Sequence, residues 1–121
     1  MRLLRLSLLL TLPAVLTGCA GGGGRSAPPG PNEVVTTEYR FEPRDVTVQP
    51  GVELDVRNDG QIAHDLTVEQ PGSGRRLVGT DTFLSGDGGK LRVDLPPGRY
   101  KMVCTVPGHE QRGMVGVLRV R

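Results

Sequence analysis

Cysteine, histidine and aromatic side chains are scarce in this chain of 121 residues. It contains two cysteines, two histidines and no tryptophan, and only 3% of its residues are aromatic. Two cysteines cannot form a disulfide-dense scaffold, a four-cysteine zinc site or an iron–sulfur cluster. Two histidines exclude any site that needs three imidazoles from one chain. With 36% apolar residues, the sequence can still build the core of one domain.

Strong net charge and long apolar runs are also absent. The formal net charge is +2, and the basic residues do not form a run. Nucleic-acid binding needs a concentrated basic surface, so we expect no nucleic-acid partner. The most apolar stretch, residues 6–16, is interrupted by Pro13. It is too short for a transmembrane helix, which needs about 20 apolar residues.

Residues 1–18 have the layout of an export signal. Two arginines precede the apolar stretch, which runs into a Leu-Thr-Gly-Cys motif that ends at Cys19. This motif resembles the lipobox of bacterial lipoproteins, which implies cleavage after Gly18 and lipid attachment to Cys19. We therefore expect a lipid-anchored protein outside the cytoplasm, on the periplasmic side of a bacterial membrane or on the cell surface.

Removing this leader changes the charge and exposes a linker. Both leader arginines are lost, which leaves thirteen basic side chains against thirteen acidic ones. Residues 19–32 follow the cleavage site and are rich in glycine and proline. A flexible chain of this length spans about 20 Å, enough to let a tethered domain reach a partner. We predict that this domain comprises residues 33–121.

The pattern of residues 33–121 predicts an all-β domain. Short segments alternate apolar and polar residues, and turns rich in glycine, proline, asparagine and aspartate separate them. The clearest predicted strands cover residues 46–48, 52–56, 66–69 and 91–95. Residues 71–89 are predicted to form a loop with a short edge strand around 76–84. Because so small a domain needs both sheet faces packed, we expect a Greek-key β-sandwich.

The segment Cys104 to Met114 carries the most informative motif, a C-x4-H-x4-M spacing that includes His109. In the alternation along their strands, Cys104 and His64 each fall on the same face as the neighbouring apolar residues. Both side chains should therefore point inward at strand ends. The turn predicted at 107–108 would carry His109 back toward Cys104. A thiolate, two imidazoles and a thioether are a donor set that suits copper.

Other metal centres fit this inventory less well. A dinuclear copper centre needs a second cysteine four residues after Cys104, where this chain has Gly108. Type 2 and multicopper oxidase sites need further histidines. Zinc accepts a His₂Cys set, although a methionine in the fourth position argues against it. A centre with four protein ligands has no open position for a substrate, so we do not expect an enzyme.

Residues 33–121 resemble the cupredoxins, the small blue copper proteins that include plastocyanin, azurin, auracyanin and rusticyanin. The resemblance rests on four segments. These are Tyr39-Arg-Phe-Glu-Pro43, Val46-Thr-Val-Gln-Pro-Gly51, Asn58 with His64, and the Cys104–Met114 loop. The loop spacing is most similar to auracyanin and rusticyanin. Two features depart from the family pattern: Asp65 stands where relatives often carry asparagine, and 71–89 matches no family motif.

The resemblance implies one type 1 copper ion with three strong ligands and one weak axial ligand. These are His64, Cys104 and His109, with Met114 in the axial position. Asp65 and Thr105 would hold the ligand loops and tune the sulfur through hydrogen bonds. The carbonyl of Ala63, just before the first histidine, could approach copper from the other side, as in azurin.

These features together predict a membrane-tethered, monomeric electron carrier. Copper would cycle between Cu(I) and Cu(II), taking one electron from one redox partner and passing it to another. Candidate partners are a cytochrome, a quinol-oxidising complex or a terminal oxidase. The exchange route would be the edge of His109, inside an uncharged patch. This patch comprises Ile62, Ala63, Val106, Pro107, Gly108 and Gly113. The alternatives are a copper-sequestering or copper-delivery lipoprotein, and a metal-free sandwich used for adhesion.

Overall fold

The computed structural model describes residues 27–121. The predicted signal peptide, Cys19 and the first part of the linker lie outside these residues. The described part of the chain forms nine strands joined by turns and loops. Nothing in it is a helix long and apolar enough to cross a membrane.

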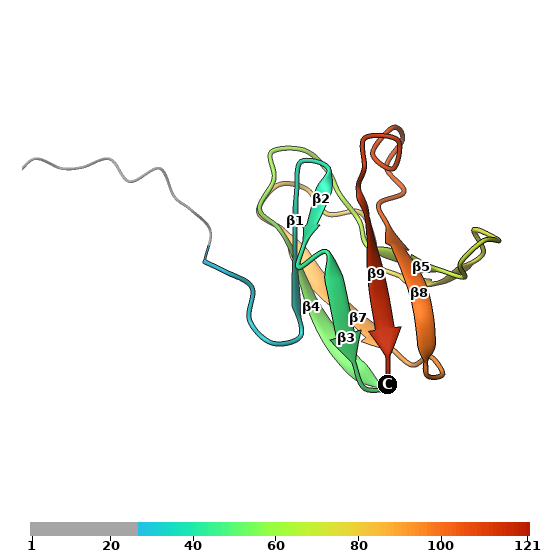
Figure 1. Cartoon of the computed structure of the whole chain (residues 1–121). Coiled ribbons are helices and arrows are strands. Elements are labelled where there is room, and N and C mark those ends of the chain that lie inside the picture. The colour runs from blue at the N-terminus through green and yellow to red at the C-terminus, as the bar shows by residue number, and fades with distance from the viewer. Residues whose placement is uncertain (1–26) are drawn as a thin grey trace, which may run out of the picture.

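The nine strands form two sheets that pack face to face (Figure 1). The first sheet has the order β2 (Arg40–Glu42), β1 (Glu33–Thr37), β4 (Val52–Asn58) and β7 (Gly88–Val93). The second has the order β3 (Asp45–Val48), β9 (Val115–Val120), β8 (Gly98–Val103), β5 (Thr67–Glu69) and β6 (Arg76–Gly79). The predicted all-β sandwich is therefore confirmed.

Two strand pairs in this sandwich are parallel, and the other neighbours are antiparallel. The parallel pairs are β1 with β4 and β3 with β9. Strands that are consecutive in sequence often lie in different sheets, so the chain crosses between the layers several times, as a Greek-key arrangement requires.

The alternation of side chains explains most of the strands. In β4, Leu54 and Val56 point into the core while the residues between them face solvent. Leu54 lies opposite Leu91 of β7, so each face of this strand pair is consistently apolar or polar. Residues 76–79 form β6 at the edge of the second sheet, within the range predicted for an edge strand.

The strands β1 and β2 were not predicted from the alternation. Val34, Val35 and Thr36 are buried one after another, so β1 shows no period of two. It lies between β2 and β4 in the interior of its sheet. Thr36 is buried without penalty because its hydroxyl lies 3.3 Å from Oδ1 of Asn58 at the end of β4.

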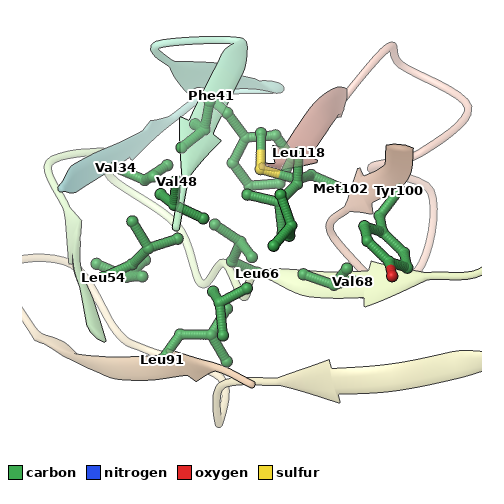
Figure 2. Close-up of a cluster of buried hydrophobic side chains, with 14 of the residues drawn as sticks. Val34, Phe41, Val48, Leu54, Leu66, Val68, Leu91, Tyr100, Met102 and Leu118 are labelled. Atoms are coloured by element: carbon green, nitrogen blue, oxygen red, sulfur yellow. The ribbon is translucent and has the colours of Figure 1, made fainter. Parts of the chain in front are cut away.

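The core fills the space between the sheets (Figure 2). Leucine and valine side chains from both layers meet there, together with Met102 of β8. Each such side chain contributes about 1.5–3 kcal/mol when it is fully buried. The same cluster includes Cys104 and Met114, so two of the predicted metal ligands belong to the hydrophobic core.

Candidate metal centre

His64 lies on the connection between β4 and β5, and backbone hydrogen bonds to a distant segment fix it there. Its N–H donates to the carbonyl of Phe83 (3.1 Å), and the N–H of Phe83 donates to its carbonyl (2.8 Å). The amide of Asn58 donates to the carbonyls of Ile62 and Phe83 and holds the two segments together. Part of the segment that matched no family motif therefore positions His64.

The other three candidate ligands lie on the loop between β8 and β9, which stands at the end of the sandwich opposite the C-terminus (Figure 1). The N–H of Cys104 donates to the carbonyl of Met114 (3.2 Å), and the N–H of Met114 donates to the carbonyl of His109 (3.1 Å). The loop turns at Gly108, whose φ of 84° lies in the left-handed region that glycine tolerates best. These bonds hold the three residues in one compact turn.

The nitrogen and sulfur donors of His64, Cys104 and His109 converge. The two Nδ1 atoms of the imidazoles are 3.2 Å apart, and the Sγ of Cys104 lies 3.4 Å from Nδ1 of His109. One donor atom from each of the three residues lies within 4.8 Å of the others, a spacing that one metal ion can bridge. Met114 is fully buried beside them, and only His109, at 7%, keeps any exposed surface.

Burial disfavours the charged forms of His64 and Cys104 in the protein without metal. Burial lowers the pKa of His64, and the neighbouring His109 lowers it further. Burial also raises the pKa of the Cys104 thiol. Cys104 is therefore favoured as the thiol, and a metal ion that binds it must displace the thiol proton.

Asp65 joins the two segments that carry the ligands. It is 3% exposed. Its Oδ1 accepts the N–H of Thr105 (2.8 Å), and its Oδ2 accepts the Thr105 hydroxyl (2.6 Å). Its own N–H points at the Sγ of Cys104, 3.5 Å away. This aspartate therefore makes the cross-link between the ligand loops. Ala63, just before His64, is half-buried.

Tyr39 and Arg112 complete the surroundings of His109, and sequence reasoning assigned neither of them a role. The Tyr39 ring meets the His109 ring edge to face, with centroids 5.1 Å apart at 87°. The guanidinium of Arg112 lies 4.7 Å from the centre of the Tyr39 ring and donates to its hydroxyl (2.8 Å). The Tyr39 motif quoted for the cupredoxin resemblance was the only signal in the sequence that could have pointed to this contact.

Comparison with known families decides the classification. Residues 31–121 match the copper-binding proteins of the plastocyanin/azurin family. This chain belongs to that family. The predicted resemblance to cupredoxins is therefore confirmed, and the donor set of this cupredoxin fits a type 1 copper centre. A search of curated protein sequences finds no match.

Solved structures share the fold of this cupredoxin. Reduced auracyanin from Roseiflexus castenholzii is 20% identical, with a TM-score of 0.64 over 74% of this chain and 94% of its own. Oxidised plastocyanin from Dryopteris crassirhizoma is 22% identical, with a TM-score of 0.59 over 74% and 99%. A copper-containing nitrite reductase from Thermus scotoductus is 19% identical, with a TM-score of 0.58 over 93% of this chain and 27% of its own. The fold thus also occurs within a larger enzyme.

Proposed function

We propose that this cupredoxin is a membrane-tethered blue copper electron carrier. The observation that carries the proposal is the buried cluster of His64, Cys104 and His109, whose donor atoms lie within 4.8 Å of one another in a member of a copper-binding family. Bound copper would supply one-electron redox chemistry between Cu(I) and Cu(II). The chain's own residues would hold the ligands, exclude water and present the site to a partner.

The ligand roles follow from the donor atoms. Cys104 and the Nδ1 atoms of His64 and His109 would be the three strong ligands, and Met114 would supply a weak thioether ligand. The cross-link between Asp65 and the ligand loop, and the bonds that close that loop, restrict how far the donors can move. If the donor atoms move little between Cu(I) and Cu(II), electron transfer requires little rearrangement of the site.

The partner would dock where His109 reaches the surface. The proposed docking patch consists of uncharged residues close to His64 and His109 in the sequence, namely Ile62, Ala63, Val106, Pro107, Gly108 and Gly113. Each of these side chains is uncharged, and Ile62 is 39% exposed. A small uncharged patch suits the brief, weak contacts of electron-transfer proteins. A cytochrome, a quinol-oxidising complex or a terminal oxidase would be the partner, and the carrier would act as a monomer.

The location proposed for this carrier rests on the sequence of its first residues. The lipobox resemblance supports a lipid on Cys19 and a site outside the cytoplasm, with residues 19–32 as the tether. Acyl chains on one cysteine together with the new amino terminus would anchor the protein far more firmly than a single chain.

Matched serine substitutions at the two cysteines test the proposal in the full chain, purified with detergent and loaded with Cu(II). The wild type should show the intense blue absorption of sulfur-to-copper charge transfer and should remain in the membrane fraction. Cys104→Ser should lose the blue colour and keep the membrane attachment. Cys19→Ser should keep the blue colour and lose the membrane attachment. A colourless Cu(II) complex of the wild type contradicts the carrier role and favours the sequestering lipoprotein. Reversible electron exchange with a cytochrome, followed by stopped flow, then separates a carrier from a blue storage protein.

A further inference from the structure

Glu38 lies in the turn between β1 and β2 and is bonded to the loop that leads into His64. Its Oε1 accepts the N–H of Gln61 (2.6 Å) and that of Ile62 (3.3 Å). Accepting two N–H bonds on one oxygen is the role of a carboxylate, which only accepts hydrogen bonds. Two backbone donors therefore fix one oxygen of this carboxylate beside the proposed metal centre.

The second ring nitrogen of His64 has no partner among the described residues. Its Nε2 is fully buried and makes no hydrogen bond. The carboxylate oxygen Oε1 of Glu38 lies 3.7 Å from it, beyond hydrogen-bond distance. A buried ring N–H without an acceptor costs about 1–3 kcal/mol. When a metal occupies Nδ1, the neutral imidazole must carry its proton on Nε2, so this atom then needs an acceptor.

Gly60 has no side chain, so the space between the Glu38 carboxylate and the His64 ring stays open. A Cβ at this position would lie 2.5 Å from Oε1 of Glu38 and 3.0 Å from Nε2 of His64. The glycine itself is held in place, because its N–H donates to Oδ1 of Asn58 (2.9 Å) and its carbonyl accepts the hydroxyl of Ser85 (2.6 Å). Any side chain here would push the carboxylate away from the imidazole.

We propose that Glu38 is a positioning residue of the copper centre, whose carboxylate accepts the Nε2–H of His64 when Nδ1 binds copper. A shift of about 1 Å brings the two atoms to the usual distance of an N–H···O bond. The bond fixes the ring orientation and the tautomer, as partners of metal-bound histidines generally do. The negative charge also favours Cu(II) over Cu(I), because the ion with the higher charge is attracted more strongly. This role rests on the proposed copper function.

The test compares Glu38→Gln with Glu42→Gln in the full chain. Both glutamate side chains are 42% exposed, and both substitutions remove one negative charge, but Glu42 pairs with Arg40 instead of facing His64. The affinities for Cu(I) and Cu(II) are measured separately by competition with chelators. For Glu38→Gln we expect the Cu(II) affinity to fall about tenfold relative to the Cu(I) affinity, which raises the reduction potential by about 59 mV. Glu42→Gln should leave the ratio unchanged.

Gly60→Ala crowds the space between the carboxylate and the His64 ring without removing the charge, and it serves as the second variant. It should weaken Cu(II) binding and should also speed solvent exchange of the His64 Nε2 proton, measured by NMR of the diamagnetic Cu(I) protein. The proposal is overturned if Glu38→Gln shifts the ratio no more than Glu42→Gln, or if both oxidation states weaken equally. A wild type that takes up no copper, or is colourless with Cu(II), refutes the proposed function instead, so the wild-type spectrum is recorded first.

Discussion

Replacing Asp65 by alanine should destabilise the metal-free protein by about 3 kcal/mol. The substitution removes the acceptor of two hydrogen bonds from Thr105 and leaves the partly buried N–H of Thr105 without a partner. A hydrogen bond to a charged group contributes about 1.5–3 kcal/mol. The Thr105 hydroxyl can turn to water because the residue is exposed, so we count the N–H bond in full and the hydroxyl bond only in part.

Thermal and urea unfolding of the metal-free chain measure this loss. Copper must be absent, because a bound ion would add its own binding free energy to the folded state. For a domain of this size, 1 kcal/mol shifts Tm by about 4–8 °C, so the expected loss corresponds to about 12–24 °C. Asp65→Asn is the matched control. It keeps the shape and one acceptor oxygen, and it should lose only about 1 kcal/mol.

Two results would refute this reasoning. If Asp65→Ala unfolds within 1 kcal/mol of the wild type, the cross-link between the ligand segments does not stabilise the fold. If Asp65→Asn is as unstable as Asp65→Ala, the negative charge and not the hydrogen-bond geometry is responsible.

Two further predictions concern the ligands themselves. Met114→Gln should lower the reduction potential, because an oxygen donor favours Cu(II), and spectroelectrochemical titration measures it; an unchanged or higher potential would mean that Met114 does not bind copper. Burial lowers the pKa of His64 from its ordinary value of 6.5 and raises the pKa of Cys104 from its ordinary value of 9.0. The metal-free protein should therefore be most stable between about pH 6.5 and 9.0. Below this window the unfolded state binds a proton that the buried His64 does not, and above it the unfolded state releases a proton that the buried Cys104 retains, so stability falls on both sides. Urea midpoints from pH 5 to 11 check this, and Cys104→Ser should remove this thiol's share of the alkaline loss.

The strands that could be predicted from the sequence are those with one face in the core and one in solvent. β3, β4 and β7 carry this alternation plainly. In β1, three consecutive residues are buried, so the pattern that marks a strand is missing. Residues 80–87 contact the His64 segment largely through backbone bonds, such as those of Phe83. Backbone bonds depend on no particular side chain, and so they leave no motif.

The residues of the candidate site also differ in whether the sequence alone could reveal them. Cys104, His109 and Met114 lie on one loop, so their spacing is visible in the sequence. His64 could be added because its parity points it inward. Glu38 lies on a different turn, and a surface glutamate is too common to attract notice. Only the fold brings its carboxylate to within 3.7 Å of His64.

The parallel pairing of β3 with β9 has a consequence for the order in which this molecule assembles. Within residues 27–121, β3 is an edge strand and β9 is its only neighbour in the sheet. Residues 45–48 therefore have no strand to pair with in this sheet until residues 115–120 are in place. Because β9 also closes the ligand loop against β8, the second sheet and the cluster of donor atoms are completed by the same event. Pairings so distant in sequence are slow to form. Copper that arrives earlier would meet the donors of the Cys104–Met114 segment without His64 held beside them.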